Sequence, residues 1–278
     1  MHFPQLKTDQ DAKNNYIRVN EVLKYAVVTG ASSGIGWHIS RELAARGYSI
    51  VAVSNQAEQL NDLKSELEKD YQIEVQTIDC DLSETSAAED IFDFCQQKKL
   101  KIEVLVNNAG MLIYGEVVHT DIKKIRTILQ LHMNTPVMLC RLFGALMETD
   151  QKGYILNVSS ISAVMPYPTI SLYGPTKTFI RQFTRALRSE MKGTGVSILC
   201  LLPGATATPL HDAGGVNMLL ATRLGIMKKP EYVAKAGVTA LFKKRAVCIP
   251  GLLNKFIIRF MFLIPDFLIQ FIHRRRKK

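Results

Sequence analysis

TGASSGIG, at residues 29–36, stands between a short β-branched run and an amphipathic stretch that continues to Arg46. It predicts a β-strand over 24–29, a turn, and a helix over about 34–46. Glycine lets the backbone bend sharply and approach a ligand closely, and free N–H groups at the start of a helix stabilise a negative charge. The segment therefore predicts a site for the pyrophosphate of a dinucleotide. The alternative is a glycine turn that only connects the strand to the helix.

Outward from this segment, apolar runs of strand length alternate with longer helical patterns. Such alternation predicts right-handed βαβ crossovers and a parallel sheet that is covered on both faces. We therefore expect an α/β fold with a doubly wound, Rossmann-type sheet in a single domain (24–251), between a leader (1–23) and a tail (252–278). The further expected strands are 50–53, 74–78, 104–106, 154–158, 196–202 and 246–249, and the helices are 60–69, 87–95, 122–147, 172–191 and 230–244.

The net charge of +10 is concentrated at the C-terminal end of the chain. Residues 228–278 hold 13 of the 35 Lys and Arg but only two of the 25 Asp and Glu. These basic residues alternate with Phe, Ile, Leu and Met, which favours an anionic membrane surface over nucleic acid as a partner. The first 23 residues hold no apolar run long enough for a signal peptide. Five scattered cysteines without C-x-x-C spacing indicate no metal site and fit a reducing, cytoplasmic compartment.

The tail combines a narrow polar stripe with a broad apolar face at helical spacing. Its apolar portion, 256–272, would be only about 25 Å long as a helix and contains Arg259, Pro265 and Asp266, which disfavours a membrane span. We expect an amphipathic helical extension that lies peripherally on the cytoplasmic face of a membrane, anchored by residues 274–278. The alternative is that the tail packs over a substrate mouth or a partner subunit.

The glycine spacing G-x-x-x-G-x-G resembles that of the short-chain dehydrogenase/reductase family, and further motifs of that family follow in order. They are Asp81-Leu82, Asn107-Asn108-Ala109-Gly110, Asn134, Ser160, Tyr173-x-x-x-Lys177 and Pro203-Gly204, so the resemblance covers about 24–251. It implies an oxidoreductase that interconverts a carbonyl and an alcohol with NAD(P). One local departure is Gly174-Pro175, which is compatible with a first helical turn because an N–H at that point would have no partner.

The expected catalytic residues are Asn134, Ser160, Tyr173 and Lys177. The last two lie four apart on a predicted helix, so both side chains project from one face. An ordinary phenol, with a pKa near 10, is a poor acid at neutral pH, and a neighbouring ammonium should lower that pKa. The resemblance implies that Tyr173 exchanges a proton with the substrate, that Lys177 binds the nicotinamide ribose, that Ser160 holds the substrate oxygen, and that Asn134 holds a water leading to Lys177. Taken alone, the Tyr-Lys pair would be an ordinary solvated pair and Asn134 a helix-breaking residue.

The cofactor-binding residues that the resemblance implies lie in the turns that follow the strands. The second strand ends in Val53-Ser54-Asn55-Gln56, without an acid that would bind ribose hydroxyls and repel a 2′-phosphate, and without an arginine. This favours NADP(H), with NAD(H) as the alternative. The expected cofactor contacts are Gly30, Ser32, Ser33, Gly34, Ile35, Gly36, Asn55, Asp81, Leu82, Asn108, Ala109, Gly110, Tyr173, Lys177, Pro203, Gly204, Thr206 and Thr208, the last alternatively a helix cap.

Two apolar segments are expected to cover the substrate. They suggest a hydrophobic small molecule or acyl chain of the 3-oxoacyl, ketosteroid or ketolipid class, or alternatively they only pack a flap. A homo-oligomer formed through the helices 122–147 and 172–191 is implied by the resemblance. The rival hypotheses are a nucleotide-sensing protein and a lipid-binding membrane adaptor on the same fold without turnover. The apolar residues are Val164, Met165, Tyr167, Ile170, Leu210, Met218, Leu219, Leu220, Leu224, Ile226 and Met227.

Overall fold

The computed structural model describes residues 23–164, 168–208 and 227–261. Its centre is a sheet of seven parallel strands in the order β3-β2-β1-β4-β5-β6-β7. The chain therefore moves outward from β1 in one direction and then returns to build the other half, which confirms the doubly wound topology. The strands are β1 (Lys24–Thr29), β2 (Ser49–Ser54), β3 (Val75–Asp79), β4 (Lys101–Asn107), β5 (Gly153–Val158), β6 (Val196–Leu201) and β7 (Val247–Cys248).

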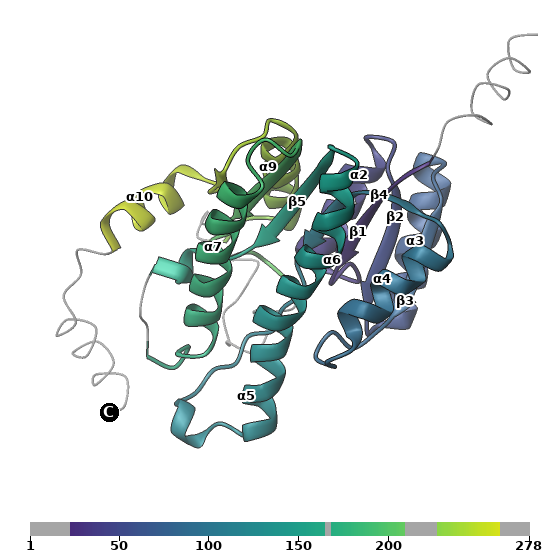
Figure 1. Cartoon of the computed structure of the whole chain (residues 1–278). Helices are drawn as coiled ribbons and strands as arrows, with labels where there is room; N and C mark the ends of the chain where they lie inside the picture. Colours follow the sequence, from purple (N-terminus) through teal and green to yellow (C-terminus); the bar gives the residue numbers. More distant parts are fainter. Residues whose placement is uncertain (1–22, 165–167, 209–226, 262–278) are drawn as a thin grey trace, which may run out of the picture.

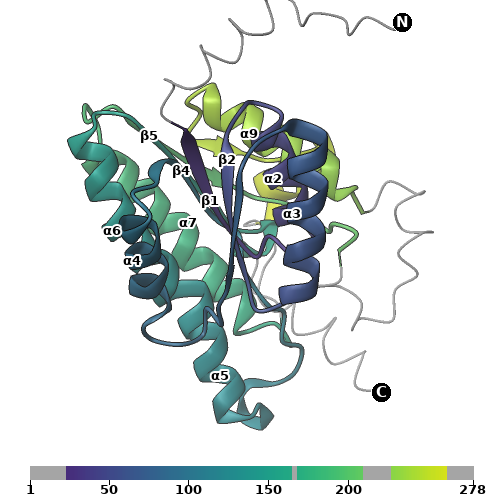
Figure 2. The ribbon, with the colours of Figure 1, turned by 90° about the vertical axis from the view of Figure 1, so that its right-hand side faces the viewer.

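Helices cover both faces of this sheet (Figure 1, Figure 2). One face carries α2 (Gly34–Ala44), α3 (Ala57–Tyr71) and α9 (Pro230–Phe242), and the other carries α4 (Ala87–Gln97), α6 (Thr135–Thr149) and α7 (Tyr173–Glu190). Successive strand residues point to opposite faces, so Val28 packs with Ile39 while Val27 packs with Phe143. Burial on both faces explains why the strands read as continuous apolar runs.

The helix expected over 122–147 is interrupted. It consists of α5 (Ile122–Leu129), a π-helical turn η2 (Gln130–Asn134), and α6. Pro136 stands in the first turn of α6, and proline has no N–H to donate to the carbonyl four residues earlier, which here belongs to His132. A π-helical turn rotates the helix face, and such turns often occur at functional sites. As a result His132 is buried and Asn134 is exposed.

The tail begins as the helix α10 (Leu252–Met261), and the remainder, 262–278, lies outside the described residues, as do the leader and most of the expected substrate flap (209–226). Within the described ranges, no helix combines the length and apolar character that a membrane crossing needs. The turns that follow β1, β2, β4, β5 and β6 meet at the carboxyl edge of the sheet. This is the edge at which open α/β sheets bind ligands.

Candidate active site

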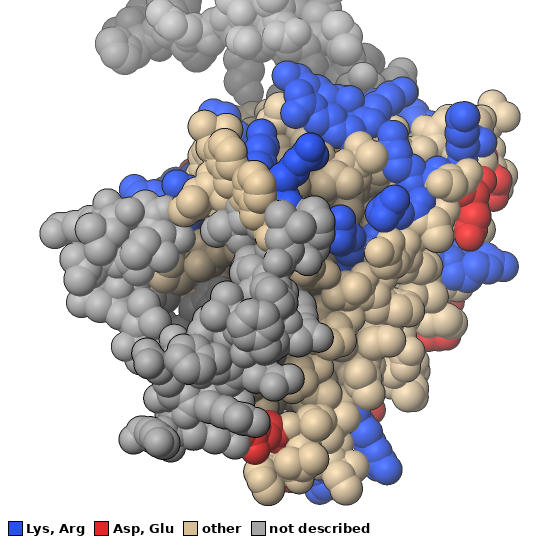
Figure 3. All heavy atoms as spheres, turned by 90° about the vertical axis from the view of Figure 1, so that its left-hand side faces the viewer, with Lys and Arg blue, Asp and Glu red and all other residues tan. Residues whose placement is uncertain are grey.

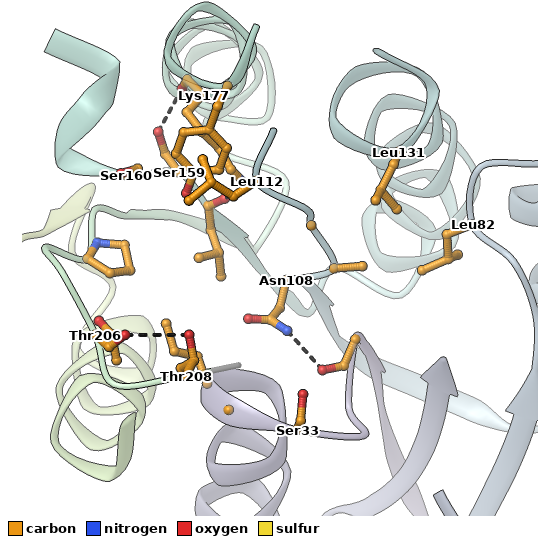
Figure 4. A pocket seen from close by; sticks show the side chains of 18 of the residues that line it. Ser33, Leu82, Asn108, Leu112, Leu131, Ser159, Ser160, Lys177, Thr206 and Thr208 are labelled. Carbon is orange, nitrogen blue, oxygen red and sulfur yellow. Dashed lines mark hydrogen bonds between the residues drawn. The ribbon is translucent and has the colours of Figure 1, made fainter. Parts of the chain in front are cut away.

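A cavity of about 630 Å³ opens at the carboxyl edge of the sheet. Its walls come from the turns that follow the strands and from the start of α7. It brings together all of the sequence-predicted site residues except Gly36 and Asn134. Figure 4 shows Ser33 on one side of this pocket and Ser160 and Lys177 on the opposite side, with Asn108 between them.

The glycine turn forms the floor of the pocket. Gly30 has φ +63°, a conformation that only glycine adopts readily, and its carbonyl closely faces Gly36. A Cβ on Gly36 would lie 2.0 Å from that oxygen. Gly36 therefore packs the turn against the helix and does not line the pocket, and its cofactor contact stays a prediction.

Two side chains join this floor to the turn after β4. Asn108 donates from Nδ2 to the carbonyls of Thr29 (3.0 Å) and Gly30 (3.1 Å), as Figure 4 shows in part. The hydroxyl of Thr29 accepts from the backbone N–H groups of Asn108 (2.9 Å) and Ala109 (3.1 Å) and donates to Val106. These bonds fix the two turns on either side of the point where the strand order reverses.

The two adjacent serines after β5 have different environments. Ser159 is buried, and its hydroxyl donates to the backbone carbonyl of Lys177 at 2.7 Å. Ser160 lines the pocket, and its hydroxyl acts on the phenol of Tyr173, whose pKa it lowers. The structure therefore places Ser160, and not Ser159, beside the phenol.

Lys177 and Tyr173 lie on the first turns of α7 and point into the same pocket. The ammonium of Lys177 is 5.8 Å from the centroid of the tyrosine ring and donates to the carbonyl of Val158 at 3.0 Å. Pro175 falls within the first turn of α7 and leaves the helix intact, as expected.

The electrostatics of this pair differ from the prediction. Burial raises the pKa of Tyr173, an effect that the neighbouring Ser160 hydroxyl opposes, whereas burial lowers the pKa of Lys177 to about 8. The expectation that the ammonium of Lys177 lowers the pKa of Tyr173 is therefore wrong for the protein without a bound cofactor. The physical reason is that removing a charge from water disfavours the phenolate and the ammonium alike.

Asn134 does not reach the site. It is exposed, and its amide donates to the side chain of Gln130 at 2.9 Å. His132 occupies the interior position, with its ring beside Tyr173 and its Nε2 next to Gly110. The described contacts give no support to the predicted water relay from Asn134 to Lys177, because the π-helical turn places Asn134 outward and His132 inward. Pro136 was the signal in the sequence that could have indicated this.

Sequence reasoning also missed an apolar wall beside the catalytic pair. The wall lies next to the predicted residue Ile170, which lines the pocket, whereas Met165 and Tyr167 lie outside the described residues. The side chains of this wall lie in segments that come after the family motifs and belong to no motif themselves, so only the fold brings them together. They are Leu112, Tyr114 and Ile161, while Leu131 lines the pocket next to Leu82 (Figure 4).

The donor set of the pocket fits a dinucleotide. Gly34 in the glycine turn has φ +55°, and a Cβ on it would lie 2.9 Å from Thr208, so this part of the pocket lining requires glycine. Asp81 and Lys177 are the charged side chains among the described residues that line the pocket, and no lining residue at the end of β2 is acidic. In the described part of the chain no three His, Cys, Asp or Glu side chains come close enough together to hold a metal ion.

The chain is similar in sequence to known proteins. The family model described as "short chain dehydrogenase" matches residues 24–215. The chain is 37% identical over 193 residues to very-long-chain 3-oxoacyl-CoA reductase-A of Danio rerio, covering 67% of this chain and 59% of the relative. It is 34% identical over 222 residues to 17-beta-hydroxysteroid dehydrogenase type 3 of Homo sapiens, covering 78% and 70%. The chain thus spans less than two thirds of the length of the first of these relatives.

Solved structures agree with this fold. A 7beta-hydroxysteroid dehydrogenase superposes with a TM-score of 0.79 at 25% identity, covering 85% of this chain and 91% of that one. A short-chain dehydrogenase from Sphingobium yanoikuyae in complex with NADPH superposes with a TM-score of 0.76 at 25% identity, covering 83% and 88%.

Proposed function

This chain belongs to the short-chain dehydrogenase family, and from that premise we propose that it interconverts a carbonyl and a secondary alcohol on an apolar substrate. The observation that carries the proposal is the meeting of Ser160, Tyr173 and Lys177 in the same cavity as the glycine turn. The apolar wall beside Tyr173 supports a hydrophobic substrate. The relatives named as reductases of very-long-chain 3-oxoacyl-CoA and as hydroxysteroid dehydrogenase point to 3-oxoacyl thioesters, ketosteroids or ketolipids.

The mechanism follows from the positions of the side chains. A nicotinamide cofactor, when bound, supplies the hydride for reduction. Tyr173 donates its phenolic proton to the carbonyl oxygen, and Ser160, which lines the same pocket beside that phenol, binds the same oxygen. The phenolate that remains is a buried anion, so the nearby ammonium of Lys177 stabilises it.

A screen of carbonyl compounds tests this proposal. Purified full-length chain would be incubated with 3-oxoacyl thioesters, ketosteroids and long-chain ketolipids, with NADPH and with NADH, while the nicotinamide absorbance is followed. Consumption of the reduced cofactor with at least one class is the expected result. No turnover with any class, while the cofactor still binds, would contradict the proposal.

The rate of reduction is expected to fall as the pH rises through about 8. The reason is that burial lowers the pKa of Lys177 to about 8, so its ammonium is lost first, while Tyr173, whose pKa burial raises, keeps its proton. The measurement is kcat at saturating substrate from about pH 6 to pH 10. In Lys177→Met the residual rate should lose this decline. If kcat declines only well above the ordinary pKa of tyrosine, the decline is due to deprotonation of Tyr173 and not of Lys177.

We propose that NADP(H) is preferred over NAD(H), because Asn55 and Gln56 at the end of β2 bring no negative charge to the pocket. Asn55→Asp should then weaken NADPH binding by about tenfold and strengthen NADH binding, since a carboxylate repels a 2′-phosphate and accepts from ribose hydroxyls. Equilibrium binding of both cofactors is the measurement. Asn61→Asp, on the exposed side of α3, adds the same charge as a control. An unchanged ratio of the two affinities would sink the preference.

We propose that α10 and the rest of 252–278 hold the protein peripherally on the cytoplasmic face of an anionic membrane. Leu252, Leu253, Phe256 and Phe260 are 57–72% exposed, while Asn254 is buried against Gly204 at the pocket wall. Figure 3 shows Lys and Arg gathered over the upper part of one face of the molecule. At the end of α7, Arg188 donates to the carbonyl of Lys244 in the turn after α9. Exposed apolar and basic groups together favour such a surface.

Flotation with vesicles that contain anionic phospholipid tests this contact. The full-length chain is expected to float with the vesicles, whereas a chain without residues 252–278 stays in the soluble fraction. Phe256→Glu with Phe260→Glu should weaken flotation, because it charges the exposed face of α10 while Asn254 stays in place. Equal recovery of full-length and truncated chains in the soluble fraction would refute the membrane contact.

We also propose a homo-oligomer that uses the faces of α6 and α7. Met138 on α6 and Phe179 on α7 are more than a third exposed although they are large and apolar, and Phe179 stacks on Phe183. Sedimentation equilibrium of the full-length chain measures the state directly, and Phe179→Glu should shift it toward the monomer. A monomer at all concentrations would contradict this assembly.

A further inference from the structure

His132 is the buried titratable side chain nearest to the catalytic pair that the proposed mechanism does not use. It is 1% exposed and lies in the middle of the π-helical turn η2. Its ring meets that of Tyr173 edge to face, with 5.7 Å between the centroids and 73° between the planes. The histidine thus stands directly behind the phenol that is proposed to transfer the proton.

Both ring nitrogens of His132 have partners on different elements. Nε2 accepts from the backbone N–H of Met111 at 3.0 Å, in the segment that continues from the pocket-lining turn after β4. Nδ1 lies 2.9 Å from the hydroxyl of Thr176 on α7, and that hydroxyl donates to the carbonyl of Tyr173 at 2.9 Å. The ring therefore joins the turn after β4 to the first turn of α7.

The backbone donor fixes the state of the ring. Because the N–H of Met111 can only donate, Nε2 must carry the lone pair, and Nδ1 must carry the proton that goes to Thr176. Protonation of Nε2 would set two donors against each other and would place a cation beside Lys177. Burial and that neighbouring charge hold the pKa of His132 well below its usual value. Lys177 and Tyr173, both on α7, are the titratable groups that face the ring.

Gly110, in the turn after β4, is closely packed between His132 and Lys177. A Cβ on this residue would lie 3.0 Å from Nε2 of His132 and 3.5 Å from the amine of Lys177. The turn after β4 therefore passes through the narrow space between the histidine and the lysine. Any shift of the ring would be transmitted to the turn and to the start of α7 together, because packed interiors leave little free volume.

We propose that His132 is a positioning residue, whose neutral ring clamps the first turn of α7 to the cofactor-lining turn after β4 and so fixes Tyr173 and Lys177 relative to the bound cofactor. The proposal rests on the proposed function. It explains why the chain interrupts a long helix at this point, since the π-helical turn brings the imidazole inward.

Three substitutions at one site separate positioning from packing. His132→Phe keeps a ring but loses both hydrogen bonds, so kcat should fall about 10- to 100-fold, the scale of a small misplacement of catalytic groups. The dissociation constant of NADPH should change by less than about twofold, since the pocket-lining residues remain. His132→Asn and His132→Gln each keep one donor and one acceptor, and both should recover part of kcat.

Thr176→Val provides a second route to the same clamp, because it removes the hydroxyl while keeping the shape of the side chain and leaves His132 in place. It should lower kcat in the same direction, and His119→Asn, at an exposed histidine outside the pocket, serves as the control. A kcat within twofold of wild type in both His132→Phe and Thr176→Val would overturn the proposal. So would a parallel loss of kcat, NADPH affinity and thermal stability, which is the pattern of a structural defect.

A spectroscopic readout does not need turnover. In the ¹⁵N-histidine-labelled chain, one neutral ring with its proton on Nδ1 should persist without titrating from about pH 5.5 to pH 9, and it should vanish in His132→Phe. A titrating ring, or a proton on Nε2, would overturn the clamp. If the wild-type chain reduces no carbonyl compound, the proposed function fails, while the tautomer of His132 still decides whether the clamp exists.

Discussion

Replacing Tyr173 by phenylalanine is expected to lower kcat for carbonyl reduction by about 10²- to 10⁴-fold, the usual contribution of a positioned general acid. The substitution removes only the phenolic hydroxyl, and the ring keeps its edge-to-face contact with His132. The free energy of unfolding should therefore change by no more than about 1 kcal/mol. Single-turnover reduction with bound NADPH, together with urea unfolding, measures both quantities.

The matched control is Tyr232→Phe, which removes the same hydroxyl from an exposed position on α9 outside the pocket. It should leave kcat and NADPH binding at wild-type values. If Tyr173→Phe also left the physiological activity of the protein unchanged, a nucleotide-sensing protein without turnover would be the better description. Loss of NADPH binding in Tyr173→Phe would instead show that the hydroxyl binds the cofactor more than it serves the proton transfer.

The sequence predicted the fold well because the decisive information is local. Each strand is an apolar run that ends in a turn with its own residue pattern, and a parallel sheet needs long crossovers between such runs. The glycine turn, the turn after β4 and the start of α7 all lie at strand or helix ends, so the topology alone brings them to one edge. The errors in the bounds are of a few residues, as at β7, where only Val247–Cys248 pair.

The parts of the site that the sequence did not predict depend on long-range packing. The family resemblance selects Asn134, whereas the π-helical turn before Pro136 turns His132 inward instead. The pKa directions of Tyr173 and Lys177 depend on how completely the surrounding elements exclude water, which spacing along one helix does not encode. The apolar lining by Leu112 and Leu131 likewise exists only after the turn that follows β4 and the α5–α6 region have come together.

Gly36→Ala is expected to weaken NADPH binding by about 100-fold and to lower the free energy of unfolding by about 3 kcal/mol, the upper range for overpacking a core. Although Gly36 does not line the pocket, a Cβ there would lie 2.0 Å from the carbonyl oxygen of Gly30 and 2.6 Å from the amide nitrogen of Asn108. Neither group can move freely, because Asn108 holds the carbonyls of Thr29 and Gly30 in place. The floor of the pocket must therefore shift.

Gly144→Ala distinguishes this clash from a general effect of adding a methyl group. Gly144 lies within α6, where a Cβ would make an ordinary contact of 3.8 Å with Ile155, and alanine is preferred to glycine inside a helix. That variant should bind NADPH normally and be as stable as wild type or slightly more so. Urea unfolding and equilibrium binding measure the two effects. A loss of stability and NADPH affinity in Gly36→Ala, but not in Gly144→Ala, would show that the turn itself requires glycine. Normal NADPH binding by Gly36→Ala would mean that the turn can rearrange without loss, and the glycine turn would then no longer support a pyrophosphate site.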